Sequence, residues 1–116
     1  MIRKFGSFDV ERREQMRGGP GTVTLEHLFH KDEFGGEHVR LCARLVIPPG
    51  SGIGPHEHDE EDEFFLILRG RAIVQDNETT AELGPGDTLL TGRGGSHSIT
   101  CKENETLEVL AFIITY

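Results

Sequence analysis

Short runs of strand-forming residues, each ended by glycine or proline, recur along this chain of 116 residues. Fifteen glycines and five prolines separate runs that are rich in Val, Ile, Leu, Phe and Thr. Proline cannot donate a hydrogen bond to a sheet, and no stretch has a helical pattern of useful length. The sequence therefore predicts an all-β fold, either a sandwich or a small barrel. The expected strands cover residues 22–29, 41–47, 63–69, 71–75, 80–83, 88–91, 97–102 and 107–115.

The length of the chain is typical of a domain with one hydrophobic core, so we expect a single domain over residues 1–116. Residues 1–21 have no clean hydrophobic period and end in a glycine-rich stretch, Arg17-Gly18-Gly19-Pro20-Gly21. We therefore expect an N-terminal extension that forms a loop.

Charge and hydropathy exclude several classes of partner. The formal net charge is −8, and no block is rich in lysine or arginine. Nucleic acids and anionic membranes bind to basic patches, so we expect neither as a partner. The longest apolar run, residues 109–114, is too short to span a bilayer, and the first residues do not resemble a signal peptide. We expect a cytoplasmic protein in which Cys42 and Cys101 are free thiols.

Three histidines and one glutamate have the spacing of metal ligands. His56 and His58 are two residues apart, so on a strand both side chains would leave the same face. Glu63 begins the next apolar run, and His97 follows a glycine-rich loop. Together they form a complete set of protein ligands for one divalent transition metal. Six-coordinate Mn, Fe, Co or Ni would keep two open positions, whereas Zn usually takes four or five ligands; we favour Mn or Fe.

These residues resemble the two sequence motifs of the cupin family. The first motif is a glycine, two histidines, a glutamate and a second glycine at fixed spacing. Here Gly50, His56, His58, Glu63 and Gly70 match every position.

The second motif is matched by Gly86, Gly94 and His97, with two departures. Gly92 stands where the family has proline, and Cys101 stands where it has asparagine. Neither departure affects a proposed ligand. The two motifs together cover residues 50–101.

The resemblance implies a double-stranded β-helix, also called a jelly roll, that binds one divalent metal. It leaves the activity open, because cupins include dioxygenases, decarboxylases, isomerases and binding proteins. Our first hypothesis is a metal-dependent enzyme of one of these three classes that acts on a small organic acid or phenol. The alternative is a non-catalytic module that binds or senses a small molecule.

Arginines are candidates for binding an anionic substrate, because a guanidinium can hold a carboxylate through two hydrogen bonds. We place Arg93 at the rim of the pocket and Cys101 in its wall, and Arg40, Arg44 and Arg69 are weaker candidates. Residues 57–63 contain six acidic side chains. They could attract cations to the site, or they could form a solvated turn between two strands. We favour the solvated turn for all of them except Glu63. We expect the remaining histidines at the surface or a sheet edge: His27, His30 and His38.

Alternation along two strands predicts a second subunit. If Glu63 points inward, Phe65 and Ile67 share its face, and the last strand alternates in the same way. The opposite faces are also apolar, and a strand that is apolar on both faces needs cover on both. We therefore expect a homodimer that covers these side chains: Phe64, Leu66, Leu68, Leu110, Phe112 and Ile114.

Overall fold

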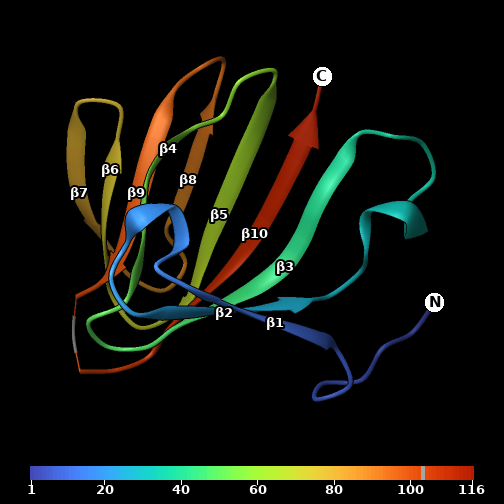
Figure 1. Cartoon of the computed structure of the whole chain (residues 1–116), viewed down its shortest axis with the longest axis horizontal. Helices are drawn as coiled ribbons and strands as arrows, with labels where there is room; N and C mark the ends of the chain where they lie inside the picture. Colours follow the sequence, from blue (N-terminus) through green and yellow to red (C-terminus); the bar gives the residue numbers. More distant parts are fainter. Residues whose placement is uncertain (103) are drawn as a thin grey trace.

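Ten β-strands in two antiparallel sheets dominate the computed structural model, which describes residues 1–102 and 104–116 (Figure 1). The larger sheet has the strand order β1-β2-β3-β10-β5-β8, and the smaller has the order β4-β9-β6-β7. The strands are β1 (Asp9–Glu14), β2 (Thr22–His27), β3 (Val39–Ile47), β4 (Gly52–Glu57), β5 (Glu61–Arg69), β6 (Ala72–Asp76), β7 (Thr79–Leu83), β8 (Thr88–Gly92), β9 (Ser96–Cys101) and β10 (Leu107–Thr115). Two short 3-10 helices, η1 (Met16–Gly18) and η2 (Lys31–Glu33), flank β2.

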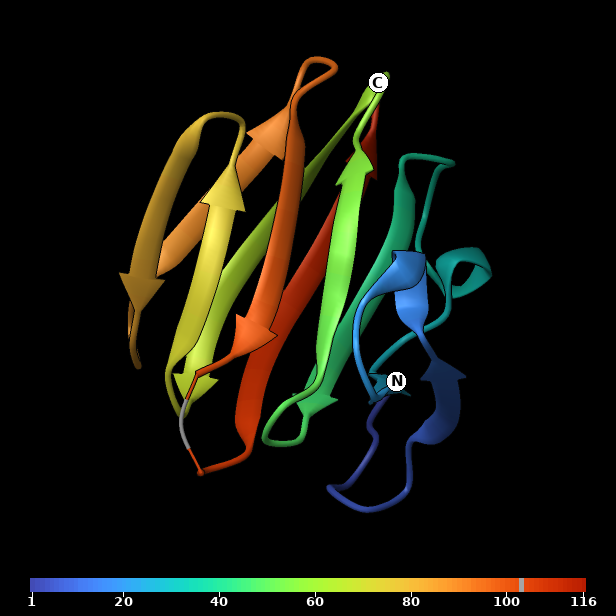
Figure 2. The ribbon, with the colours of Figure 1, turned by 60° about the vertical axis from the view of Figure 1, so that its left-hand side comes forward.

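The two sheets face each other and enclose one hydrophobic core. In Figure 2 the strands of the smaller sheet lie in front of the central strands of the larger one. The inward side chains alternate as the sequence predicts: Phe65 and Ile67 on β5 are both 1% exposed, and Val109 on β10 is fully buried. The all-β jelly-roll expectation is confirmed. No helix within residues 1–102 and 104–116 is long and apolar enough to cross a membrane.

The outer face of the larger sheet is apolar and partly open. Leu68, Leu90 and Ile114 are 45%, 63% and 48% exposed. Phe112, in contrast, packs edge-on against Phe34, with 6.5 Å between the ring centroids. The segment that follows η2 therefore covers part of this face, and the end of β5 and the edge strand β8 remain open.

The N-terminal segment is more regular than the sequence predicts. We expected a loop over residues 1–21, but β1 occupies Asp9–Glu14 and pairs with β2 along its whole length. Val10 is the single apolar residue of this strand and is 59% exposed, so β1 has no hydrophobic alternation that would reveal it. Backbone hydrogen bonds to β2 hold this edge strand in place.

The segment from β1 to β2 closes one end of the sandwich through backbone contact. A Cβ atom added at Gly54 of β4 would lie 2.1 Å from the carbonyl oxygen of Arg17. Only glycine allows η1 to approach β4 so closely. Gln15 and Arg17 themselves adopt left-handed conformations, with φ values of 49° and 53°. This turn brings Arg17 next to the strand that carries His56.

Candidate metal centre

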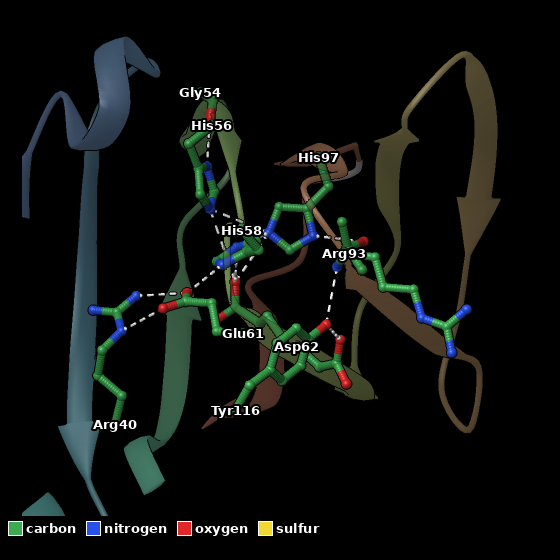
Figure 3. Close-up of polar contacts among 11 residues, drawn as sticks. Arg40, Gly54, His56, His58, Glu61, Asp62, Arg93, His97 and Tyr116 are labelled. Carbon is green, nitrogen blue, oxygen red and sulfur yellow. Dashed lines mark hydrogen bonds and ion pairs between the residues drawn. The ribbon is translucent and has the colours of Figure 1, made fainter. Parts of the chain in front are cut away.

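Four side chains from three strands and one connection converge between the two sheets. His56 lies on β4, Glu63 on β5 and His97 on β9, and β5 belongs to the sheet opposite the other two strands. We expected His56 and His58 to share one face of a strand. Instead, β4 ends at Glu57, and His58 lies directly after it. Figure 3 shows the three imidazole rings pointing toward one another.

Backbone hydrogen bonds fix His58 although it lies outside a strand. Its N–H donates to the Gly95 carbonyl, and its own carbonyl accepts from the Gly94 N–H, both at 2.9 Å. The glycine-rich loop before His97 therefore also positions His58. Tyr116 secures the same loop, because its hydroxyl accepts from the Arg93 N–H at 3.0 Å and donates to Asp62 at 2.7 Å (Figure 3).

The atoms that face one another are the Nε2 atoms of the histidines and one oxygen of Glu63. His97 Nε2 lies 2.9 Å from His58 Nε2, 3.1 Å from His56 Nε2 and 2.9 Å from Glu63 Oε1. Glu63 Oε1 also lies 2.9 Å from His58 Nε2 and 3.8 Å from His56 Nε2. All four ligand atoms lie within 4.8 Å of one another, so the group could hold a metal ion.

These separations match ligands at right angles around one ion. With metal–nitrogen bonds of about 2.1 Å, two ligand atoms at right angles lie about 3.0 Å apart, and two at the tetrahedral angle lie about 3.4 Å apart. Four of these five distances fall between 2.9 and 3.1 Å. The spacing therefore fits octahedral coordination better than tetrahedral coordination, and four protein ligands would leave two octahedral positions open.

The outer nitrogen of each histidine has a partner that fixes the position of its proton. His56 Nδ1–H donates to the Gly54 carbonyl at 2.8 Å, and His58 Nδ1–H donates to Glu61 Oε2 at 2.6 Å. His97 Nδ1–H donates at 3.0 Å to the Thr91 hydroxyl, which in turn donates to Asp76 at 2.8 Å. Such partners set the tautomer and orientation of metal-binding histidines.

The resulting arrangement needs a cation at its centre. With a proton on each Nδ1 atom, the three Nε2 lone pairs and the Glu63 carboxylate all face one small space. His58, Glu63 and His97 are 2%, 5% and 1% exposed, so water screens this repulsion poorly. A divalent ion would satisfy all four groups at once.

Burial and polar contacts shift the pKa values of Glu63 and His97 in the direction that metal binding requires, and that of His58 in the opposite direction. Burial opposes ionisation of Glu63, but its contacts with the three histidines outweigh burial and hold its pKa well below the ordinary value. Burial lowers the pKa of His97, and Glu63 offsets this only in part. Burial would also lower the pKa of His58, but hydrogen bonds to Glu63 and Glu61 raise it. Glu63 is thus an anion, and His97 is neutral.

A cavity of about 70 Å³ opens beside three of these side chains: His56, His58 and Glu63. Arg13 from β1, Arg17 from η1 and Arg40 from β3 also line it, and apolar residues of β2, β3, β4 and β10 complete the wall. Arg13 pairs with Glu11 at 2.6 Å. Arg40 holds both oxygens of Glu61 at 2.9 Å, and Glu61 in turn accepts from His58 (Figure 3).

The two residues that we expected beside a substrate, Arg93 and Cys101, do not line this cavity. Arg93 is exposed, and its side chain extends away from the histidines (Figure 3). Cys101 belongs to the hydrophobic core, where its thiol donates to the Glu105 carbonyl at 3.1 Å. Neither lines the 70 Å³ cavity. Arg44 and Arg69 form ion pairs with glutamates away from it.

No pattern in the sequence marks Arg13 or Arg17 as a cavity residue, and Arg40 was among our weaker candidates. Arg17 was visible only as the first residue of a glycine-rich stretch. Its position in the cavity depends on the left-handed backbone of η1 and on the contact with Gly54, which are features of the three-dimensional structure.

A family model described as the cupin domain matches residues 43–113. The chain is 40% identical over 114 residues to the oxalate-binding protein of Thermotoga maritima, and the match covers 98% of this chain and 93% of that protein. It is also 28% identical over 86 residues to an uncharacterized protein of Methanocaldococcus jannaschii, covering 74% of this chain and 68% of that one.

Solved structures show the same architecture. A predicted oxalate decarboxylase from Thermotoga maritima superimposes with a TM-score of 0.95 at 39% identity, covering 100% of both chains. A cupin superfamily protein from Desulfitobacterium hafniense gives a TM-score of 0.68 at 19% identity, covering 90% of this chain and 82% of that one. The second match supports the fold alone.

Proposed function

Because this chain belongs to the cupin family, we propose that it binds a small dicarboxylate such as oxalate at a divalent metal. His56, His58, Glu63 and His97 would hold the metal. When bound, the metal would polarise the carboxylate oxygens of the ligand as a Lewis acid. The spacing near right angles suits six-coordinate manganese, iron, cobalt or nickel better than zinc, and of these we favour manganese or iron.

One observation carries the choice of ligand: the cavity is small and is lined by three arginines. A volume of about 70 Å³ has room for only a few water molecules. That space suits a short acid such as oxalate and disfavours a substituted phenol. Three guanidinium groups favour an anion. Arg13 and Arg40 already have carboxylate partners, whereas no ion pair within residues 1–102 and 104–116 involves Arg17. Arg17 is therefore the group that we propose to hold the free end of the dicarboxylate.

The cavity favours binding over catalysis. Decarboxylation of oxalate yields carbon dioxide and formate, and a proton must reach the carbon that loses the carboxylate. Among the described residues that line the cavity, Glu63 is the single carboxylic side chain, and it belongs to the metal ligands. Arginine keeps its proton at physiological pH and is a poor general acid. The alternative, a metal-dependent decarboxylase, is favoured by the similarity to the predicted oxalate decarboxylase of Thermotoga maritima.

Calorimetric titration of the manganese-loaded protein with oxalate tests the proposal. We expect stoichiometric binding of oxalate, weaker binding of the longer succinate, and no binding of catechol. Arg17→Ala should weaken oxalate binding at least tenfold without loss of metal, and Arg93→Ala, a matched surface change, should have no effect. Wild-type protein that binds metal but not oxalate would refute the choice of ligand. Formate released from oxalate would replace the binding function with the enzymatic one.

We also propose that the protein is a homodimer that buries the open part of the outer face. Leu68, Leu90 and Ile114 form an exposed apolar group on neighbouring strands. Exposed groups of this kind often mark an interface. The location that we propose is the cytoplasm, where buried thiols such as Cys42 and Cys101 stay reduced.

A further inference from the structure

A second hollow, of about 440 Å³, lies next to the metal cavity on the β1–β2–β3 side of the sandwich. We call it the outer basin and define it by the polar residues that line it: Glu11, Arg13, His27, His30, Lys31 and Arg40. Arg13, Arg40 and Leu41 line both hollows. The outer basin and the metal cavity therefore adjoin at these three side chains.

The two arginines at this boundary are tied to carboxylates on opposite sides. Arg13 pairs with Glu11 at 2.6 Å, and Arg40 pairs with Glu61 at 2.9 Å. Both guanidinium side chains are 46% exposed, so solvent reaches them. They form a charged boundary through which an anion can pass from one hollow to the other.

The histidines of the basin are ordered by acidic neighbours. His27 Nε2 lies 3.0 Å from Glu11, and His30 Nε2 lies 2.7 Å from Asp9. The two imidazole rings stack with their centroids 5.2 Å apart. Lys31, at the start of η2, has no ion-pair partner within residues 1–102 and 104–116. Its ammonium group is thus available to a ligand in the basin.

Three cationic side chains line the basin, in a chain whose net charge is −8. Arg13 and Arg40 are neutralised by Glu11 and Glu61, so Lys31 is the lining cation that has no ion-pair partner within residues 1–102 and 104–116. Three acidic residues, Asp59, Glu60 and Asp62, follow His58 in the sequence, so the positive charge of Lys31 belongs to an otherwise acidic chain. A local field of this sign raises the concentration of anions at one side of a site and lowers it at the other.

We propose that the outer basin is an approach site that captures the anionic ligand and delivers it past Arg13 and Arg40 to the metal. The ligand class is the small dicarboxylate of the proposed function, on which this inference rests. Lys31 provides the attraction from outside, and Arg17 receives the ligand inside. The basin increases the rate of association and contributes little to the lifetime of the complex, as charges at the rim of a site generally do.

Stopped-flow mixing of oxalate with the cobalt-loaded protein measures the association rate directly, because the visible absorption of Co²⁺ changes when the ligand binds the metal. Lys31→Glu changes the local charge by two units. Acting on a dianion about 10 Å away, this change predicts an association rate about threefold lower at an ionic strength of about 0.1 M, where the Debye length is about 10 Å, and a larger difference at lower ionic strength. The dissociation rate should stay unchanged, and the difference from wild type should vanish at high salt.

Lys102→Glu is the matched control. It makes the same change in net charge, and the segment after β9 lies on the opposite side of the molecule from η2 in both Figure 1 and Figure 2. Its association rate should equal that of the wild type. Equal rates in all three proteins at low salt, or a slower association in Lys102→Glu that matches Lys31→Glu, would overturn the proposal.

A second measurement separates the approach site from the metal site. In the diamagnetic zinc-loaded protein, titration with oxalate should shift the amide resonances of His27, His30 and Lys31 even when the metal does not take the ligand. Shifts in the basin without any change at the metal would support the basin and refute the proposed function. A titration that leaves all three basin resonances in place would refute the basin.

Discussion

Thr91→Val should weaken metal binding although Thr91 is not one of the candidate metal ligands. The Thr91 hydroxyl accepts a hydrogen bond from His97 Nδ1–H at 3.0 Å and donates a hydrogen bond to Asp76 at 2.8 Å. Valine has the same shape and no hydroxyl, so the substitution removes both hydrogen bonds and leaves the volume of this buried position unchanged. The proton of His97 is then free to occupy Nε2, which is the atom that would bind the metal.

Two magnitudes follow from the burial of this pair. Thr91 and His97 are 2% and 1% exposed, so water cannot replace the lost acceptor. An unsatisfied buried donor costs about 1–3 kcal/mol of folding free energy. Loss of the partner that orients a metal-binding histidine typically lowers metal affinity by about 10–100-fold, or about 1.4–2.8 kcal/mol. The Phe65 ring stacks on His97 at a centroid distance of 4.9 Å and keeps its plane in place, so we expect the chain to fold.

Competition with a chromophoric chelator measures the affinity, and thermal unfolding without metal measures the cost in stability. Thr91→Ser is the control, because serine retains the hydroxyl and should stay within about threefold of wild type in metal affinity. If Thr91→Val binds metal as tightly as Thr91→Ser, the hydroxyl does not set the tautomer of His97. The assignment of Nε2 as the ligand atom would then be wrong.

Three other perturbations test the centre and the outer face. His58→Ala and His97→Ala should each lose bound metal by elemental analysis and still give a β-sheet circular dichroism spectrum, because the core does not depend on the ion; full occupancy in either variant would contradict the ligand set. Glu63 and Glu61 raise the pKa of His58 above its ordinary 6.5, so the metal must displace a proton that is held more tightly. Metal affinity should therefore fall as the pH falls through this raised pKa, and an affinity that is constant between pH 8 and pH 6 would exclude His58 as a ligand. Leu90 is 63% exposed, and Leu90→Asp should convert a dimer into a monomer of 12.9 kDa in sedimentation; a wild-type monomer would refute the interface.

The inward and outward faces of β5 and β10 could be predicted, because apolar residues mark the buried positions in their sequences. β5 and β10 lie at the centre of the larger sheet, and their inward residues alternate with outward ones over nine residues each. The four candidate ligands could be predicted for a different reason. Histidine and glutamate at this spacing have few structural uses, so their chemical identity carries the information.

The arginines could not be predicted, because backbone geometry alone determines where they point. Arg13 lies on an edge strand that has no apolar alternation, and Arg17 depends on a left-handed turn packed against Gly54. Arg40 is the additional residue of a β-bulge, since Leu41 pairs with Ile113 and Val39 pairs with Ile114. A bulge redirects a side chain without any change in the hydrophobic pattern. Arg93 and Cys101 have motif positions, and these gave no information about the direction of their side chains.

The candidate metal ligands and the arginines that we propose to bind an anion come from different parts of the fold. The candidate metal ligands lie on or directly after β4, β5 and β9, strands that also carry core residues. The three cavity arginines come from the edge strand β1, from η1 and from the bulge of β3. Side-chain substitutions in β1 and η1 are therefore expected to change the charge and size of the cavity and leave the ligand set in place. Two contacts connect the groups: the Arg17 carbonyl packs on Gly54, whose own carbonyl accepts from His56, and Arg40 reaches His58 through Glu61. We therefore expect that residues 9–18 can change the anion that the cavity accepts without loss of the proposed metal, provided that both contacts are preserved.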